Sequence, residues 1–206
     1  MAGFYAARDH IMPPLMWPSI APPFTHAEAG RLICLMAKQV STEFTDHDLP
    51  VQEEATRKIT KLRLQIEQVN KIAAIYGAPS TISFDHLDDH VARARVEVGR
   101  WLSQLALVIP STAAPGKAFA RMNAGIAPAK RGKESSKDCL VYETYLEAAR
   151  ELRAAGLTTP IVFLSSNTNE YLEERRILKP EIAAEFSQLT MDYSPNMAAA
   201  KHELGF

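Results

Sequence analysis

Carboxylates and polar side chains that could bind a metal ion gather in two short stretches of the second half of the chain. Ser-Ser-Lys-Asp-Cys at 135–139 begins an expected helix, and Asp138 lies in its first turn, where a carboxylate suits the positive end of the helix dipole. Ser-Ser-Asn-Thr-Asn-Glu-Tyr at 165–171 follows a short apolar run at 160–164, which predicts a strand covered on both faces. Ligands of α/β sheets bind at the carboxyl ends of the strands, so we expect Asp138 and the polar turn to meet there.

The helix between the two stretches follows from local signals. Ser135 or Ser136 is a good N-cap, because its hydroxyl can accept a hydrogen bond from a free backbone N–H of the first turn. Gly156 suits the left-handed residue that ends a helix. Four apolar residues at helical spacing form the stripe that we expect to be buried: Val141, Tyr145, Ala148 and Leu152.

The order of acid, apolar helix, buried strand and Ser-x-Asn-x-x-Glu-Tyr resembles the second half of a PIN-like domain. Val-Ser-Thr-Glu-Phe at 40–44 resembles another signature of this family, an apolar strand that runs into a helix carrying an acid. PIN domains are Mg²⁺- or Mn²⁺-dependent nucleases, mostly of single-stranded RNA, and their acids hold the metal at the end of a parallel sheet. The resemblance covers the chain from about Leu32 onward. It implies a three-layer α/β/α domain with a mostly parallel sheet.

The resemblance also implies a set of site residues. Glu43 and Asp138 match the second and third acids of the family and are the expected metal ligands. Asn167 stands at the fourth position and Glu170 at the secondary acid three residues later, so these four residues form the expected catalytic set. Ser165 matches the small hydroxyl residue that orients the site.

Glu143 is a further candidate, as a residue that supports the metal ligands. It lies five residues after Asp138, about 140° around a helix at roughly 100° per residue, and therefore need not face the same site. The alternative interpretation is an acid on the protein surface.

Residues 1–30 depart from the family pattern. Several prolines, at 13, 14, 18, 22 and 23, interrupt any regular element. The family's first strand, which ends in Asp-Thr/Ser-Asn and supplies the first metal ligand, has no counterpart that we recognise. We therefore expect an irregular or truncated N-terminal segment. The missing acid leaves two functions open, a metal-dependent ribonuclease and a PIN-like domain that binds RNA or protein without cleaving.

A long helical hairpin is expected inside the PIN-like domain, which we place at residues 31–206. Residues 50–76 and 84–107 carry apolar side chains in steps of four and three, the seam of packed helices, and Gly-Ala-Pro-Ser at 77–80 separates them. The two helices are expected to pack antiparallel as an insertion at 50–108. The hairpin could grip a substrate or partner, or be a structural insertion that packs on the domain or forms a homodimer. A third hypothesis is an unrelated helical scaffold in which the hairpin carries the function.

A basic segment precedes Asp138. Basic side chains neutralise RNA phosphates while a metal acts on the scissile one, so Lys130, Arg131, Lys133 and Lys137 are the expected RNA-binding residues. The alternative is a solvated loop. The segment as a whole contains Lys117, Arg121, Lys130, Arg131, Lys133 and Lys137, with Glu134 as the opposing acid.

Composition limits the possible partners. The formal net charge is −1 over 206 residues, so RNA binding would depend on a local basic patch. Two distant cysteines, with no disulfide framework, and the lack of both a signal peptide and an apolar run of about 20 residues favour the cytoplasm and no membrane. The expected cofactor is Mg²⁺ or Mn²⁺. The expected partner is single-stranded RNA, with an antitoxin protein as a further partner if the chain is the toxin of a toxin–antitoxin pair.

Overall fold

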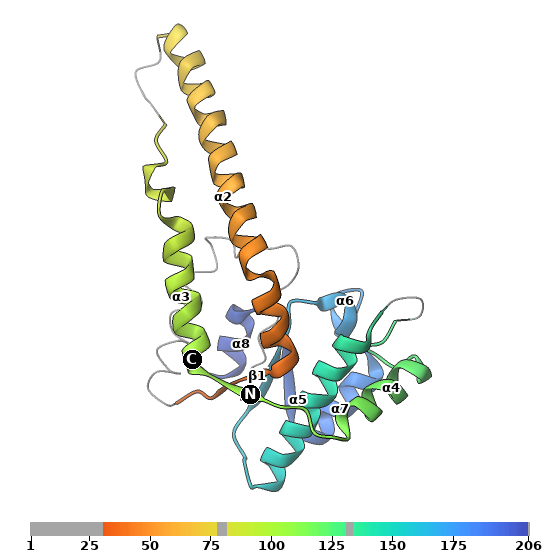
Figure 1. The fold of residues 1–206 in the computed structure, drawn as a ribbon. Helices are drawn as coiled ribbons and strands as arrows, with labels where there is room; N and C mark the ends of the chain where they lie inside the picture. The colour runs from red at the N-terminus through yellow and green to blue at the C-terminus, as the bar shows by residue number, and fades with distance from the viewer. Residues whose placement is uncertain (1–30, 78–81, 131–133, 206) are drawn as a thin grey trace. The chain divides into compact units, whose positions relative to one another are not determined.

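The computed structural model describes residues 31–77, 82–130 and 134–205 (Figure 1). The chain forms two compact units: Thr45–Ser103 is the second, and the first comprises Met1–Phe44 and Gln104–Phe206. The described part combines helices with short strands, most of them paired in parallel, which agrees with the expected α/β class. The segment 1–30, and with it the expectation of an irregular N-terminus, lies outside the described residues.

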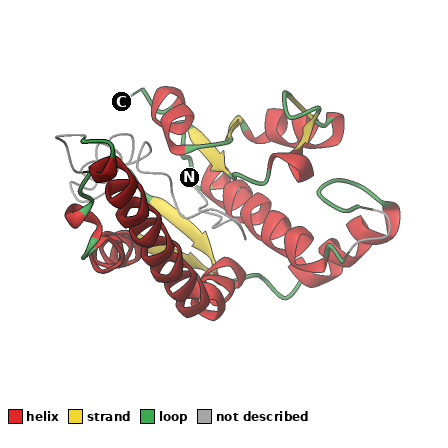
Figure 2. Ribbon diagram, turned by 90° about the horizontal axis from the view of Figure 1, so that it is seen from above, coloured by secondary structure: helices red, strands yellow, loops and turns green. Residues whose placement is uncertain are grey.

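Two parallel strand pairs form the sheets of the first unit. In one pair, β1 (Cys34–Ala37) runs beside β2 (Leu105–Val108), with Cys34 opposite Leu105. In the other, β3 (Ile161–Leu164) runs beside β6 (Met191–Ser194), with Ile161 opposite Met191. Figure 2 draws the strands in yellow and the helices in red. A short antiparallel pair is added by β4 (Leu172–Glu173) and β5 (Ile177–Leu178).

Helices make up most of the described chain. They are α2 (Lys38–Ile75), α3 (His90–Gln104), α4 (Ala114–Ala124), α5 (Ser136–Ala154), α6 (Thr168–Tyr171), α7 (Pro180–Leu189) and α8 (Met197–Glu203), with a 3₁₀ turn at Asp85–Leu87. Two segments differ from the expectation. Pro50 lies inside α2 instead of starting a helix. Residues 105–107, expected to end the helix at 84–107, belong to the strand Leu105–Val108, whose apolar run pairs with β1.

Helix α5 is the element on which both parallel pairs pack. The hydroxyl of Tyr145 accepts a hydrogen bond from the N–H of Ala37 at the end of β1, over 2.8 Å. Phe163 of β3 packs edge-on against Tyr145 and Tyr142, with ring centroids 5.6 and 6.1 Å apart. Phe186 of α7 also contacts Phe163, at 5.7 Å. The aromatic side chains of α5 therefore join strands that are distant in sequence.

Tyr145→Phe is expected to lower the free energy of unfolding by about 1–3 kcal/mol, because it leaves the buried N–H of Ala37 without an acceptor. Burial raises the pKa of Tyr145 to about 12, so the hydroxyl is neutral at physiological pH. The measurement is the midpoint of urea unfolding at unchanged slope. Tyr76→Phe, at an exposed tyrosine, is the control. A Tyr145→Phe midpoint no lower than that of the control would show that this hydrogen bond contributes nothing.

The second unit contains the outer part of α2 together with α3. The side-chain amide of Asn70 bonds to both backbone groups of Ile82, at 2.7 and 2.9 Å. Two ion pairs also connect α2 with the segment that contains α3. Arg95 of α3 pairs with Asp48 of α2 at 2.8 Å, and Arg63 of α2 pairs with Asp88, just before α3. None of the side chains of α3 is fully buried, so this unit has little core of its own. Throughout the described residues, each helix is either too short or too polar to cross a lipid bilayer.

Candidate functional site

The polar turn after β3 is fixed by hydrogen bonds to β6. The N–H of Ser165 donates to the carbonyl of Ser194 over 3.0 Å, and the hydroxyl of Tyr193 donates to the carbonyl of Ser165 over 2.6 Å. The hydroxyl of Ser165 in turn accepts from the N–H of Asn167 over 3.2 Å. Ser165 is buried, and half-buried Asn167 occupies the N-cap position of α6. The two residues therefore lie together at the carboxyl end of a parallel strand pair.

Glu170, on α6, lies between two lysines. Its carboxylate Oε1 is 2.8 Å from Nζ of Lys130, and its backbone carbonyl accepts a hydrogen bond from Nζ of Lys179, also over 2.8 Å. The side chain is only 12% exposed. Its second oxygen, Oε2, is buried and has no hydrogen-bond partner in the described part of the chain. Glu170 thus offers a buried carboxylate oxygen to a further cationic group.

Glu43 of α2 lies beside the N-terminus of α5. Its Oε1 is 3.7 Å from Nζ of Lys137, the residue immediately before Asp138, and accepts a hydrogen bond from Nε2 of Gln39 over 2.9 Å. The side chain of Glu43 is 19% exposed. Asp138 is half-buried in the first turn of α5, as expected. Two acids from distant parts of the sequence therefore belong to neighbouring helix ends.

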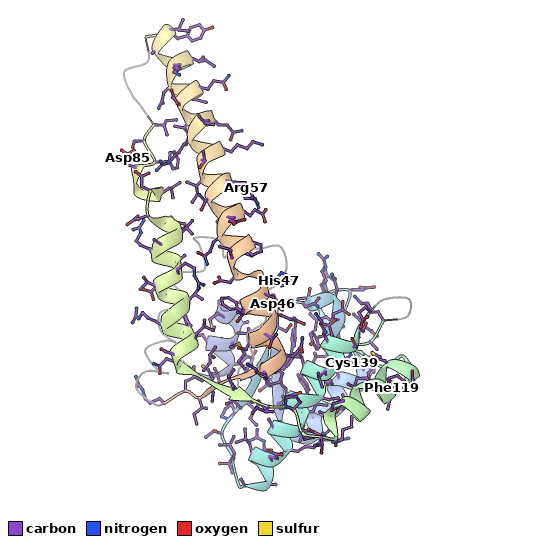
Figure 3. All side chains as sticks on the ribbon, viewed as in Figure 1. Asp46, His47, Arg57, Asp85, Phe119 and Cys139 are labelled. Atoms are coloured by element: carbon purple, nitrogen blue, oxygen red, sulfur yellow. The ribbon has the colours of Figure 1, made fainter. Side chains whose placement is uncertain are left out.

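The pKa of the Cys139 thiol reflects the charged side chains around the N-terminus of α5. Burial is the main reason that its pKa is raised to about 11, and the carboxylates of Asp138, Glu143 and Glu170 act in the same direction, against Arg121. The three acids are thus close enough to α5 to act on one buried sulfur atom, whose position Figure 3 marks. A raised pKa favours the protonated thiol at neutral pH, which is the less reactive form of a cysteine.

Ser135 stands at the N-cap of α5, but its hydroxyl does not cap the helix as expected. It accepts instead from the backbone N–H of Lys130, over 3.2 Å. The reason is competition, because a hydroxyl oxygen engaged by the preceding loop is no longer directed at the helix. Ser135 therefore fixes the backbone from which Lys130 reaches Glu170.

Glu143 is buried against Arg121 of α4. Its Oε1 is 2.7 Å from Nε of Arg121, whose guanidinium also pairs with Glu185 and lies 4.7 Å from the ring centroid of Tyr142. The hydroxyl of Tyr142 donates to the other oxygen of Glu185 over 2.8 Å. The alternative of a surface acid is therefore wrong for Glu143, because the arginine compensates its charge inside the protein.

The basic segment divides into side chains with different surroundings. Arg121, 7% exposed, is occupied by its buried acids, and Lys117 pairs with Glu147 of α5 at 2.6 Å. Lys130 and Lys137 each face a candidate acid. Arg131 and Lys133, the other two expected RNA-binding residues, lie outside the described residues.

Sequence reasoning did not find three residues at this end of the strands. Neither Lys179, directly before α7, nor Glu185, within α7, was singled out from the sequence. Ser194 is fully buried at the end of β6, and within the described chain its hydroxyl has no hydrogen-bond partner. The one available signal for Ser194 was its place directly after Met-Asp-Tyr at 191–193, a sequence that suits a short strand.

Carboxylate oxygens are the ligands that Mg²⁺ prefers, so Glu43, Asp138 and Glu170 have suitable chemistry for that ion. The lysines beside Glu43 and Glu170 show that these carboxylates accept cationic partners. Over residues 31–77, 82–130 and 134–205, however, no three His, Cys, Asp or Glu side chains gather closely enough to hold a metal ion. The acids fit a divalent cation by type, and their side chains would have to converge further to share one.

Comparisons of the chain with models of protein families, with curated proteins and with solved structures found no match. The resemblance to PIN-like domains therefore stays a prediction from the sequence motifs.

Proposed function

We propose that the chain is a PIN-like ribonuclease that uses Mg²⁺ or Mn²⁺ to hydrolyse single-stranded RNA. The observation that carries the proposal is the contact between Lys137 and Glu43, 3.7 Å apart. It joins the helix end that carries Asp138 to an acid that lies far away in the sequence. A metal-dependent phosphodiesterase needs carboxylates from distant parts of the chain to come together, and this contact brings one such acid to the helix end that carries Asp138.

In this proposal Glu43 and Asp138 hold the metal, with Glu170 as the nearby further acid. The metal, when bound, polarises the phosphate and lowers the pKa of an attacking water. Lys130 and Lys137 neutralise phosphates on either side of the scissile bond. Ser165 fixes the backbone of Asn167, so that the polar turn keeps its place at the end of β3.

The proposal includes the three-layer α/β/α arrangement with a mostly parallel sheet. Two features support it. Both β1–β2 and β3–β6 are parallel pairs. The first pair packs on α5, and β3 of the second contacts α5 through Phe163. A further helix, α8, packs on β3 and β6.

A second candidate function is RNA binding without cleavage. The specific observation in its favour is that the described residues contain no group of three acids close enough to hold a metal. The same lysines would then bind phosphates, while Glu43 and Asp138 would serve only to orient them.

Incubation of the protein with single-stranded RNA, in Mn²⁺ and in EDTA, separates the two candidates. The ribonuclease is expected to cleave in Mn²⁺ and to stop in EDTA. RNA that is bound but stays intact in Mn²⁺ would favour the second candidate. Failure to bind or cleave RNA would exclude both and leave a helical scaffold as the better description.

A further inference from the structure

The outer part of α2 carries an apolar stripe that the second unit leaves exposed. Leu62, Val69, Ile72 and Tyr76, the last just beyond the helix end, follow one another in steps of seven, three and four. Gln65 occupies the position between Leu62 and Val69 that completes the spacing of a coiled-coil contact seam. The four apolar side chains are between 38% and 83% exposed. Single exposed apolar residues are ordinary, whereas a contiguous stripe marks a contact with another molecule.

The stripe is not the face of α2 that contacts the segment with α3. The side chains that make those contacts are Asp48, Arg63 and Asn70. Arg63 and Asn70 are seven residues apart and therefore share one side of the helix. Val69 directly precedes Asn70 and points about 100° away from it. Within its own unit, α2 therefore turns one face to α3 and keeps a second, apolar face exposed.

A second copy of the chain complements this stripe in charge when the two α2 helices run antiparallel. The C-terminal end of a helix carries a partial negative charge, and the last turn of α2 has no basic side chain of its own. Lys58, one turn before Leu62, continues the stripe, and Lys61 flanks it. Antiparallel pairing places both lysines at the C-terminal end of the other copy's α2.

The same lysines argue against parallel pairing. Two parallel stripes in register would place Lys58 of one copy against Lys58 of the other, where like charges repel. The ion pair of Lys58 with Glu54 does not remove this repulsion, because both side chains are more than half exposed and such pairs are weak.

We propose that the chain forms a homodimer in which the apolar stripes of two α2 helices pack antiparallel. Leu62 of each copy then faces Ile72 of the other, and Gln65 faces Val69. One stripe serves both copies, so the contact is isologous and closes at two chains. Removal of the stripes from water drives association, and the lysines at the helix ends fix the direction. The dimer uses residues of the second unit and does not rest on the proposed function.

Sedimentation equilibrium of the full chain over a range of concentrations measures the dissociation constant of the dimer. Val69→Glu is expected to raise this constant at least about 30-fold, the effect of losing a strong contact at the centre of an interface. The physical reason is that a carboxylate from each copy would be buried among apolar side chains. Val69 is 49% exposed within one copy, so the variant is expected to stay folded, which circular dichroism checks.

Leu64→Glu is the matched control for Val69→Glu. Leu64 is 62% exposed on the same helix, and it lies five residues before Val69, about 140° around the axis and outside the stripe. The control is expected to keep the dissociation constant of the parent. A parent that sediments as a monomer at every concentration would overturn the proposal, and so would equal weakening by the two substitutions.

A second experiment tests the direction of the helices. Gln68→Cys and Glu54→Cys each receive a nitroxide label, while Cys34 and Cys139 are buried and are expected to stay unlabelled. The two labelled positions are two heptads apart and flank the stripe on the same side. In the proposed register the labels of a dimer are offset along the helix axis by about 3 Å at position 68 and about 39 Å at position 54, at 1.5 Å per residue. Double electron–electron resonance should therefore give a much shorter distance for Gln68→Cys. Equal distances at the two positions would mean parallel helices and overturn the antiparallel dimer.

Discussion

Arg121→Met is expected to destabilise the protein by about 3–5 kcal/mol, the usual cost of removing one partner of a buried ion pair. The variant keeps the length of the side chain and its packing on Tyr142, but not the charge. Glu143 and Glu185 would then lose the guanidinium that neutralises both of them, and Glu143 is 6% exposed. An uncompensated buried carboxylate must either be dehydrated at high cost or take up a proton.

Urea unfolding measures this loss as a lower midpoint at unchanged slope. Lys117→Met is the matched control on the same helix, because Lys117 pairs with Glu147 from a much more exposed position. The control should cost about 0.2–1 kcal/mol, as exposed pairs do. A second variant, Arg121→Met combined with Glu143→Leu and Glu185→Leu, should recover part of the loss because no buried charge remains. Equal midpoints for Arg121→Met and the control would refute the buried network.

The same network supports the candidate site. Arg121 donates to the carbonyl of Ala127, and Glu181 accepts from the N–H of the same residue over 3.2 Å. Ala127 lies three residues before Lys130, so a loss of Arg121 should also loosen the lysine at Glu170. We therefore expect buried charges outside the expected set of acids to affect how firmly this loop holds the ammonium group of Lys130.

The parts of the fold that could be predicted are those in which local signals agree. Helix α5 begins at the expected serines, although no serine hydroxyl caps it, and it has the expected apolar stripe and Gly156, with a φ of 91°, just beyond its end. Strand β3 is a short apolar run between polar residues, and all four of its residues are buried. In both cases several local signals favour the same element, and for β3 the separation from α5 by Gly156 and Pro160 adds to the apolar run.

Strand β2 could not be predicted in this way. Leu-Ala-Leu-Val at 105–108 directly follows a helix, and a short apolar run is compatible with either element. The segment is a strand because it pairs with Cys34–Ala37. That pairing joins residues far apart in the chain, so no local pattern indicates it. The helix start predicted at Pro50 was wrong for a different reason. Proline suits the first turn of a helix, but here it lies within α2.

The acids of the candidate site could be predicted from the sequence, but the side chains that pair with them could not. The sequence places Asp138 at a helix start and Glu170 after a buried strand, and both positions are as expected. The pairing of Glu170 with Lys130 depends on a loop conformation that no local pattern specifies. Arg121 could have been recognised, because it shares helical spacing with Ala114 and Ala118, the other buried residues of α4. An arginine on such a stripe needs an internal acid.

Asp138→Asn is expected to reduce Mn²⁺-dependent RNA cleavage by at least about 100-fold, because even residues that only support metal ligands cost up to that factor when they are changed. The amide has nearly the size of the carboxylate but lacks its charge, so it holds a divalent cation poorly. The loss of a helix-start charge should cost only about 0.3–1 kcal/mol of stability, and the variant is expected to stay folded.

The measurement combines cleavage of single-stranded RNA with Mn²⁺ affinity and thermal unfolding. Glu151→Gln is the matched control, since Glu151 is an exposed acid on the same helix, at the end away from Asp138. Asp138→Asn should lose cleavage and Mn²⁺ affinity together, while its melting temperature stays close to that of Glu151→Gln. Because Glu43 lies beside the same helix end, Glu43→Gln should repeat the pattern. A folded Asp138→Asn protein that cleaves as fast as the parent would show that the two acids do not share a metal ion.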